Sequence, residues 1–176
     1  MKDFIVLEIN ENDIDDCAKV IIDANNLICE ALGYPKNEDT SAAVSRLKDE
    51  HFADSRILKG VSGGEIVATF TVRTIGDEKK SYEIIMMAVR PDCQRQGFGQ
   101  KMLEYAQRYV SAQGGTGLFC AFPAGNETVG LWLEKNEFFV DGFFNHPSGE
   151  ICIMQKAIVP AEGCGSEGCS SCSSCG

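Results

Sequence analysis

The chain has 176 residues, of which 44% are hydrophobic, and a formal net charge of −10. This length allows one domain with a hydrophobic core, and the acidic charge argues against a nucleic-acid partner, because phosphates are held by an excess of Lys and Arg. No apolar stretch reaches the roughly 20 residues of a membrane span, and the N-terminus lacks a secretory signal pattern, so we expect a cytoplasmic protein without a membrane partner.

The first part of the chain predicts a strand followed by two helices. Residues 4–10 alternate weakly between apolar and polar side chains, as a strand does. Apolar residues then recur at helical spacing from about 12 to 32, and a second, shorter helix begins near residue 40. The residues expected to cap these helices are Asn12 or Asp13 for the first and Thr40 or Ser41 for the second.

The middle of the chain predicts a hairpin, a buried strand and a helix. The hairpin covers residues 56–75 and turns at 62–64, where two glycines are adjacent. Residues 81–89, SYEIIMMAV, are the most apolar segment, so we expect them in the centre of a sheet. Residues 98–114 have the apolar spacing of an amphipathic helix.

The last part of the domain predicts a strand at 117–122, a helix that ends near 136, and two strands at 138–144 and 150–158. The whole order predicts an α/β (α+β) fold, in which helices flank a mixed, mostly antiparallel sheet with one locally parallel crossover. We expect a domain over residues 1–158 and a tail rich in Gly, Ser and Cys over 159–176. The sequence leaves open whether the protein is a monomer or a homodimer.

The segment Pro91–Lys101, PDCQRQGFGQK, lies between the apolar strand and the following helix. Gly97 and Gly99 permit positive φ and close approach of the backbone, so several amides can point into one concavity at the helix N-terminus. The helix dipole and the charges of Arg95 and Lys101 favour an anion there, such as a phosphate or pyrophosphate. A tight turn without a ligand is the alternative.

The same segment resembles the acetyl-CoA-binding motif of the GNAT acyltransferase superfamily. Gln94–Gly99 matches its pattern of Gln or Arg, two residues, Gly, one residue, then Gly or Ala, and Val89 and Pro91 before it also match. The segment GNETVGLWLEKNEFF is similar to the second signature of the family, and the predicted order of elements over 4–158 is that of the family.

The resemblance implies an N-acetyltransferase that transfers an acetyl group from acetyl-CoA to a primary amine by direct attack. The amine would belong to a small molecule or to the N-terminus of a peptide or protein. The backbone of the turn would hold the pyrophosphate, and the end of the preceding strand would pair with the pantetheine arm. The implied cofactor-binding residues are Met87, Ala88, Val89, Gln94, Arg95, Gln96, Gly97, Phe98, Gly99, Gln100, Lys101 and Asn126.

Glu83 is the candidate general base, because a protonated amine must lose a proton before it attacks. Period-two alternation places Glu83 on one face with Ile85, Met87 and Val89, and these apolar neighbours would raise the pKa of its carboxyl. The alternative is a solvent-exposed carboxylate at the end of the strand. Tyr82 is expected to pack on the opposite face.

The general acid is open, because Leu133 occupies the position of the Tyr that protonates the leaving thiolate in the family. Water or Cys120 could supply this proton instead, although we expect Cys120 to be a buried structural thiol. The missing acid also leaves an alternative function open. This is a non-catalytic acyl-CoA-binding sensor whose cysteine tail responds to metal or redox state.

In this fold the first two helices and the last two strands contribute most to the choice of amine substrate. Acidic and aromatic residues there would suit a small cationic amine, although a solvated surface is the alternative. The candidates are Glu38, Asp39, His51, Asp141, Phe143, Phe144 and His146.

Four cysteines crowd the end of the chain: Cys164, Cys169, Cys172 and Cys175. Their separations of four, two and two residues can satisfy a tetrahedral zinc ion and resemble parts of iron–sulfur motifs. The tail therefore predicts a zinc or iron–sulfur site. A disordered, redox-active tail is the alternative.

Overall fold

The computed structural model describes residues 3–31, 35–37, 39–49, 55–76, 80–147 and 149–161. Within these residues the strands form a seven-stranded sheet in the order β1-β2-β3-β4-β5-β7-β6. The elements are β1 (Phe4–Glu8), a 3₁₀ turn (Glu11–Asp13), α1 (Ile14–Ala31), α2 (Ser41–Lys48), β2 (Ser55–Ser62), β3 (Glu65–Ile75), β4 (Ser81–Val89), a second 3₁₀ turn (Pro91–Cys93), α3 (Phe98–Ala112), β5 (Gly117–Pro123), α4 (Glu127–Lys135), β6 (Phe139–His146) and β7 (Gly149–Ala157).

The sheet is mixed and mostly antiparallel, as predicted. β4 and β5 run parallel and are joined by α3, while the other neighbouring strands are antiparallel. The predicted hairpin turn is also confirmed, because Gly63 and Gly64 both have positive φ between β2 and β3. None of the helices in the described ranges has the length and apolar character needed to cross a membrane.

The first helix is capped two or three residues earlier than predicted, whereas the N-cap of α2 is Thr40, as predicted, although its side chain makes no capping hydrogen bond. A 3₁₀ turn precedes α1, so Asn10 is the cap: its side chain accepts the amide of Asn12, and its own amide donates to Asp13 at 2.7 Å. At α2 the amide of Ser41 donates to the side chain of Asp39 at 2.8 Å. This hydrogen bond is the first cause of the lowered pKa of the Asp39 carboxyl.

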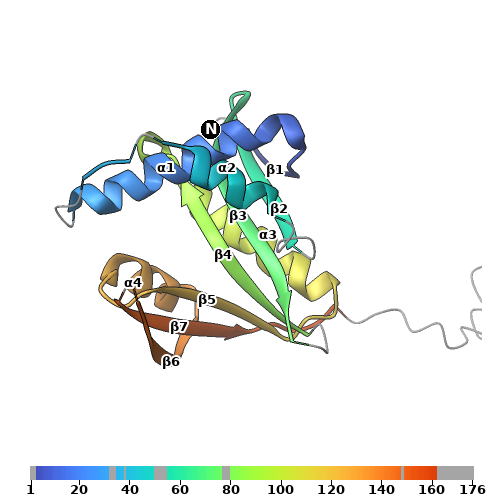
Figure 1. Cartoon of the computed structure of the whole chain (residues 1–176). Helices are drawn as coiled ribbons and strands as arrows, with labels where there is room; N and C mark the ends of the chain where they lie inside the picture. Colours follow the sequence, from blue (N-terminus) through green and yellow to red (C-terminus); the bar gives the residue numbers. More distant parts are fainter. Residues whose placement is uncertain are drawn as a thin grey trace, which may run out of the picture.

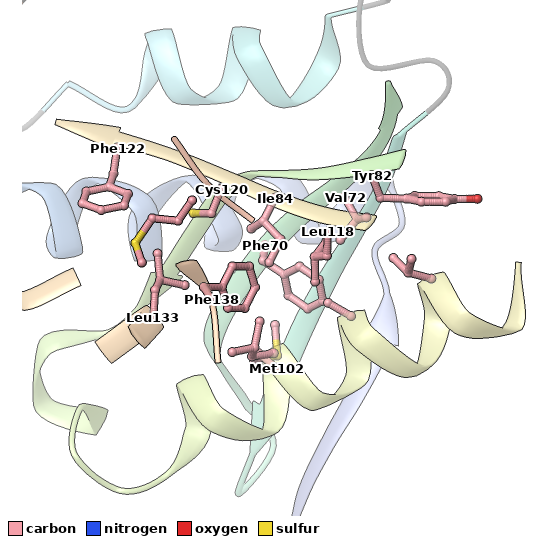
Figure 2. Close-up of a cluster of buried hydrophobic side chains, with 14 of the residues drawn as sticks. Phe70, Val72, Tyr82, Ile84, Met102, Leu118, Cys120, Phe122, Leu133 and Phe138 are labelled. Carbon is pink, nitrogen blue, oxygen red and sulfur yellow. The ribbon is translucent and has the colours of Figure 1, made fainter. Parts of the chain in front are cut away.

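Helices cover both faces of the sheet (Figure 1). α1 packs on β3 and β4, and α2 packs on α1, through a smaller cluster that includes Cys17, Val20 and Leu47. The larger cluster lies on the opposite face, where α3 and α4 pack against β3, β4, β5 and β7. Figure 2 shows this larger cluster, with Phe70, Ile84, Met102, Leu133 and Phe138 among its side chains.

A β-bulge interrupts β4 at Ile85. In the pairing of β3 with β4, Thr71 lies opposite Met86 but Val72 lies opposite Ile84, so Ile85 has no partner on β3. Such an extra residue shifts every later side chain of the strand to the other face.

The bulge reverses the predicted orientation of Glu83. Tyr82, next to Glu83, is buried in the larger cluster, as predicted, and so Glu83 points to the face of α1 and α2. After the bulge, Met87 and Val89 contact the larger cluster, while Ala88 is buried in the smaller one. The prediction that Glu83 shares a face with Ile85, Met87 and Val89 is therefore wrong.

Replacement of Leu133 by Ala should lower the free energy of unfolding by about 2–5 kcal/mol, because Leu133 is 0% exposed in the larger cluster. Leu131 on the same helix is 58% exposed, so Leu131→Ala should change the free energy of unfolding by about 0.5 kcal/mol or less. Urea unfolding of both variants provides the comparison. Equal destabilisation by the two changes would contradict the described packing of α4.

Candidate functional site

β4 and β5 separate halfway along their length. They pair only over Ser81–Ile84 and Gly117–Cys120. Beyond this point Ala121–Pro123 continue to pair with β7, and the two strands diverge in Figure 1. In the described part of the chain, the edge of β4 that faces β5 thus has no strand partner from Ile85 onward. An open strand edge can bind an extended ligand that contains amide groups.

The predicted anion-binding turn lies at the end of this open edge. Gly97 is the N-cap of α3 with φ +83°, and Arg95 also has a left-handed φ of +59°. The first backbone bond of α3 runs from the Lys101 amide to the Gly97 carbonyl at 3.1 Å, so the amides of 98–100 have no partner within the helix. Unpaired amides at a helix N-terminus favour an anion such as a phosphate.

Several side chains of the turn hold it in place and leave its backbone available. The Gln94 amide group donates to the Val89 carbonyl at 3.0 Å, and that of Gln96 donates to the Asp92 carbonyl at 3.0 Å. Phe98 is buried and stacks on the Phe4 ring, with the ring centroids 4.6 Å apart. Phe98 can therefore contact a ligand only through its backbone.

Two further predicted ligand residues also have protein partners. Gln100 donates to Glu104 at 3.2 Å, and the Lys101 ammonium lies 5.5 Å from the centroid of the Phe4 ring. At the start of α4, the Asn126 side chain accepts the Val129 amide at 3.3 Å. The capping role of Asn126 is thus confirmed, and its contact with a cofactor stays a prediction.

Glu83 forms an ion pair with Arg73, its partner on β3. The Arg73 Nε and Nη2 groups both donate to Oε2 of Glu83, at 3.1 and 2.8 Å. The Glu83 side chain is 20% exposed, and no described residue donates a hydrogen bond to its Oε1. One carboxylate oxygen is therefore fixed, and the other can receive a proton from an amine.

Sequence reasoning missed Arg73. Residues 65–75 were expected to form a strand beside 81–89, but the partner of Glu83 depends on the register between them. That register shifts at the bulge, which no local sequence pattern marked. A count of residues from both strand ends could have placed Arg73 near Glu83, but it could not have fixed the pair.

Neither Leu133 nor Cys120 can take the place of the missing Tyr as the acid. Leu133 is fully buried in the larger cluster and carries no dissociable proton (Figure 2). Burial raises the pKa of the Cys120 thiol to about 12, and the nearby Glu83 carboxylate contributes further. Cys120 would therefore transfer a proton to a less basic thiolate only uphill in free energy. The prediction that Cys120 is a buried thiol is confirmed.

The residues expected to contact the amine substrate are only partly brought together. Phe143 and Phe144 are consecutive on β6 and so point to opposite faces, Phe144 toward the face of Glu83. Asp141 accepts a hydrogen bond from Gln155 at 2.8 Å, and Asp39 accepts the Ser41 amide at the start of α2. His146 is exposed at the end of β6. Glu38 and His51 lie outside the described residues.

The predicted metal ligands, Cys164, Cys169, Cys172 and Cys175, also lie outside the described residues. Within the described ranges, no group of three or more His, Cys, Asp or Glu side chains is placed to hold a metal ion. The metal site in the tail stays a prediction.

The model of the acetyltransferase (GNAT) family matches residues 22–138. The fold is similar to ribosomal-protein-S18-alanine N-acetyltransferase from Escherichia coli, with a TM-score of 0.71, 16% identity, and coverage of 92% of this chain and 97% of that one. It is also similar to PaiA N-acetyltransferase from Thermoplasma acidophilum in complex with coenzyme A (TM-score 0.70, 13% identity, coverage 88% and 99%).

An aminoglycoside 6′-N-acetyltransferase complexed with coenzyme A is a third similar structure, with a TM-score of 0.66, 13% identity, and coverage of 89% and 98%. Identities this low show a shared fold. No curated protein matches the sequence.

Replacement of Gly97 by Ala should lower the free energy of unfolding by about 1–2 kcal/mol, because its φ of +83° is unfavourable for a residue with a Cβ. The same strain should displace the amides of the turn and weaken coenzyme A binding. Gly99 has no positive φ, and a Cβ there would meet Trp132 and Val89 at an ordinary 3.8 Å.

Gly99→Ala is therefore the matched control, and its free energy of unfolding and its affinity for coenzyme A should be close to those of the wild type. Urea unfolding measures the first quantity, and isothermal titration calorimetry measures the second. If Gly97→Ala binds coenzyme A as tightly as Gly99→Ala, the turn is not the pyrophosphate site.

Proposed function

The chain belongs to the acetyltransferase (GNAT) family, and we propose that it transfers the acetyl group of acetyl-CoA to a primary amine by direct attack. The amine belongs to a small molecule or to the N-terminus of a peptide or protein. The observation that carries this proposal is the open edge of β4 beyond Ile84, which has the Gly97 turn at its end and Glu83 at its start. Two structures of similar fold, by their names, act on an alanine of a ribosomal protein and on an aminoglycoside.

The residues present fit coenzyme A. The backbone of Met87–Val89 lies on the open edge and can pair with the amides of the pantetheine arm as a further strand would. The amides of Gln94–Gly99, with their two left-handed residues, suit the pyrophosphate. Arg95 and Lys101 add positive charge, which offsets the acidic charge of the chain locally.

Glu83 takes the proton of the amine as the reaction proceeds. Acetyl-CoA supplies the acetyl group as a thioester: the amine nitrogen forms a bond to the carbonyl carbon, the C–S bond breaks, and coenzyme A leaves as a thiolate. Oε1 of Glu83 accepts the amine proton, directly or through water, while Arg73 holds Oε2. Coenzyme A can leave as a thiolate because the thiolate is weakly basic, and Leu133 has no proton to give. Glu83 then returns the amine proton to solvent, and solvent protonates the thiolate.

Glu83→Gln should lower kcat by about 10²–10⁴-fold, because an amide cannot accept the amine proton. The affinity for coenzyme A should stay unchanged, since Glu83 lies on the face opposite Met87 and Val89. Glu104→Gln is the control, as Glu104 is exposed and its side chain accepts a hydrogen bond from Gln100. Steady-state thiol release and calorimetry provide the two readouts, and undiminished turnover of Glu83→Gln would remove Glu83 from the mechanism.

The same thiol-release assay across a panel of primary amines separates the enzyme from the sensor considered above. We expect turnover with at least one amine. Tight binding of coenzyme A with no turnover on any amine would contradict the enzyme and favour a sensor.

We also propose that the cysteine tail binds zinc or an iron–sulfur cluster in a reducing cytoplasm, on the spacing of its four cysteines. Protein purified without oxygen should then contain about one zinc ion or one cluster per full chain, and a chain ending at residue 161 should contain none. Metal analysis by mass spectrometry measures this content. Full-length protein without stoichiometric zinc or iron would reject the site.

A further inference from the structure

The sheet face that carries Glu83 continues over β5, β7 and β6, where it is mainly apolar but includes Gln155. Residues paired across neighbouring strands share a face, and Glu83 pairs with Phe119, Phe119 with Gln155, and Gln155 with Phe139. Further along the same face, Ala121 pairs with Ile153, and Ile151 pairs with Phe144. We call the following residues the distal apolar face: Phe119, Ala121, Ile151, Ile153, Phe139 and Phe144.

The distal apolar face is open on the side of α1 and α2. α1 packs on β3 and β4 and α2 packs on α1, so Phe139 is left 52% and Phe144 45% exposed. Large exposed apolar side chains that lie together usually mark a binding surface. This surface is continuous with the candidate base, because Phe119 is the direct neighbour of Glu83 on the adjoining strand.

Two polar groups on this face already have partners. The Glu83 carboxylate is paired with Arg73 through Oε2, and the Gln155 side-chain amide donates to Asp141. A substrate with several charges, or a peptide with several amides, would lose hydration over the apolar side chains without gaining partners there. The face therefore favours a substrate with one amine and an uncharged, apolar body.

We propose that the amine substrate is a small arylalkylamine, with its amino group at Glu83 and its apolar body over the distal apolar face. This inference rests on the proposed function. Neighbouring strands lie about 4.8 Å apart, so a body of about 5–14 Å that starts at Glu83 reaches Phe119 and extends toward Phe139. An aromatic ring on a short alkyl chain matches this length and can pack against the Phe side chains.

The first test compares kcat/KM for four amines: 2-phenylethylamine, ethylamine, spermidine and the dipeptide Phe-Ala. We expect kcat/KM for 2-phenylethylamine to exceed the other three by at least tenfold. A preference for spermidine or for the dipeptide would overturn the proposed substrate class.

The second test uses two aromatic residues that lie on opposite faces of the sheet. Phe119→Ala should raise KM for 2-phenylethylamine by about 5–10-fold and leave KM for acetyl-CoA unchanged, because Phe119 is the neighbour of Glu83 on β5. Phe143→Ala is the matched control, because Phe143 is 58% exposed but pairs with Cys152, which faces the larger cluster. Equal effects of the two changes would overturn the inference. So would a dimer that Phe144→Ala converts to monomer, since the face would then be an interface between copies.

A binding measurement separates this inference from the proposed function. If no amine supports thiol release, the proposed function fails, and saturation-transfer NMR of 2-phenylethylamine with the coenzyme A complex still decides the inference. Binding that is lost in Phe119→Ala and kept in Phe143→Ala supports the distal apolar face. No binding to the wild-type protein overturns it.

Discussion

The separation of β4 from β5 after Ile84 is the constraint on which the candidate site depends. β5 keeps its pairing with β7 through Pro123, so it cannot also follow β4. The end of β4 is thus held on one side by β3 and left open on the other, while the larger cluster keeps both strands in place. A rigid sheet with an open internal edge can bind a chain of amides without unfolding any pairing of its own.

Because of the bulge at Ile85, the functional side chains of β4 lie on different faces of the sheet before and after it. Before it, Glu83 points to the face of α1 and α2, where Arg73 fixes its orientation. After it, Met87 and Val89 point to the opposite cluster and anchor the open edge. The base and the anchored open edge therefore lie on one strand, before and after the bulge at Ile85. The face that carries Glu83 continues over β5, β7 and β6, so side chains far from Glu83 in the sequence contribute to the choice of amine.

Much of this fold could be predicted from the sequence, because its signals are local. Apolar periodicity placed the helices and strands, and the need for positive φ at Gly97 placed the turn before α3. The orientation of Glu83 could not be predicted, since a bulge depends on how two strands pair. Arg73 was missed for the same reason. A second bulge, at Asp141, also could not be predicted from the sequence, and for this reason the sequence does not show that Phe143 faces away from the site.

Amide hydrogen exchange of the full chain, followed residue by residue with and without coenzyme A, tests the central claim most directly. In residues 85–89, the amides that point away from β3 should exchange at least tenfold more slowly when coenzyme A is bound, as should the amides of 98–100. Amides of Ser81–Ile84, already next to β5, should change little. Coenzyme A that slows exchange elsewhere and leaves residues 85–89 and 98–100 unchanged would contradict the account.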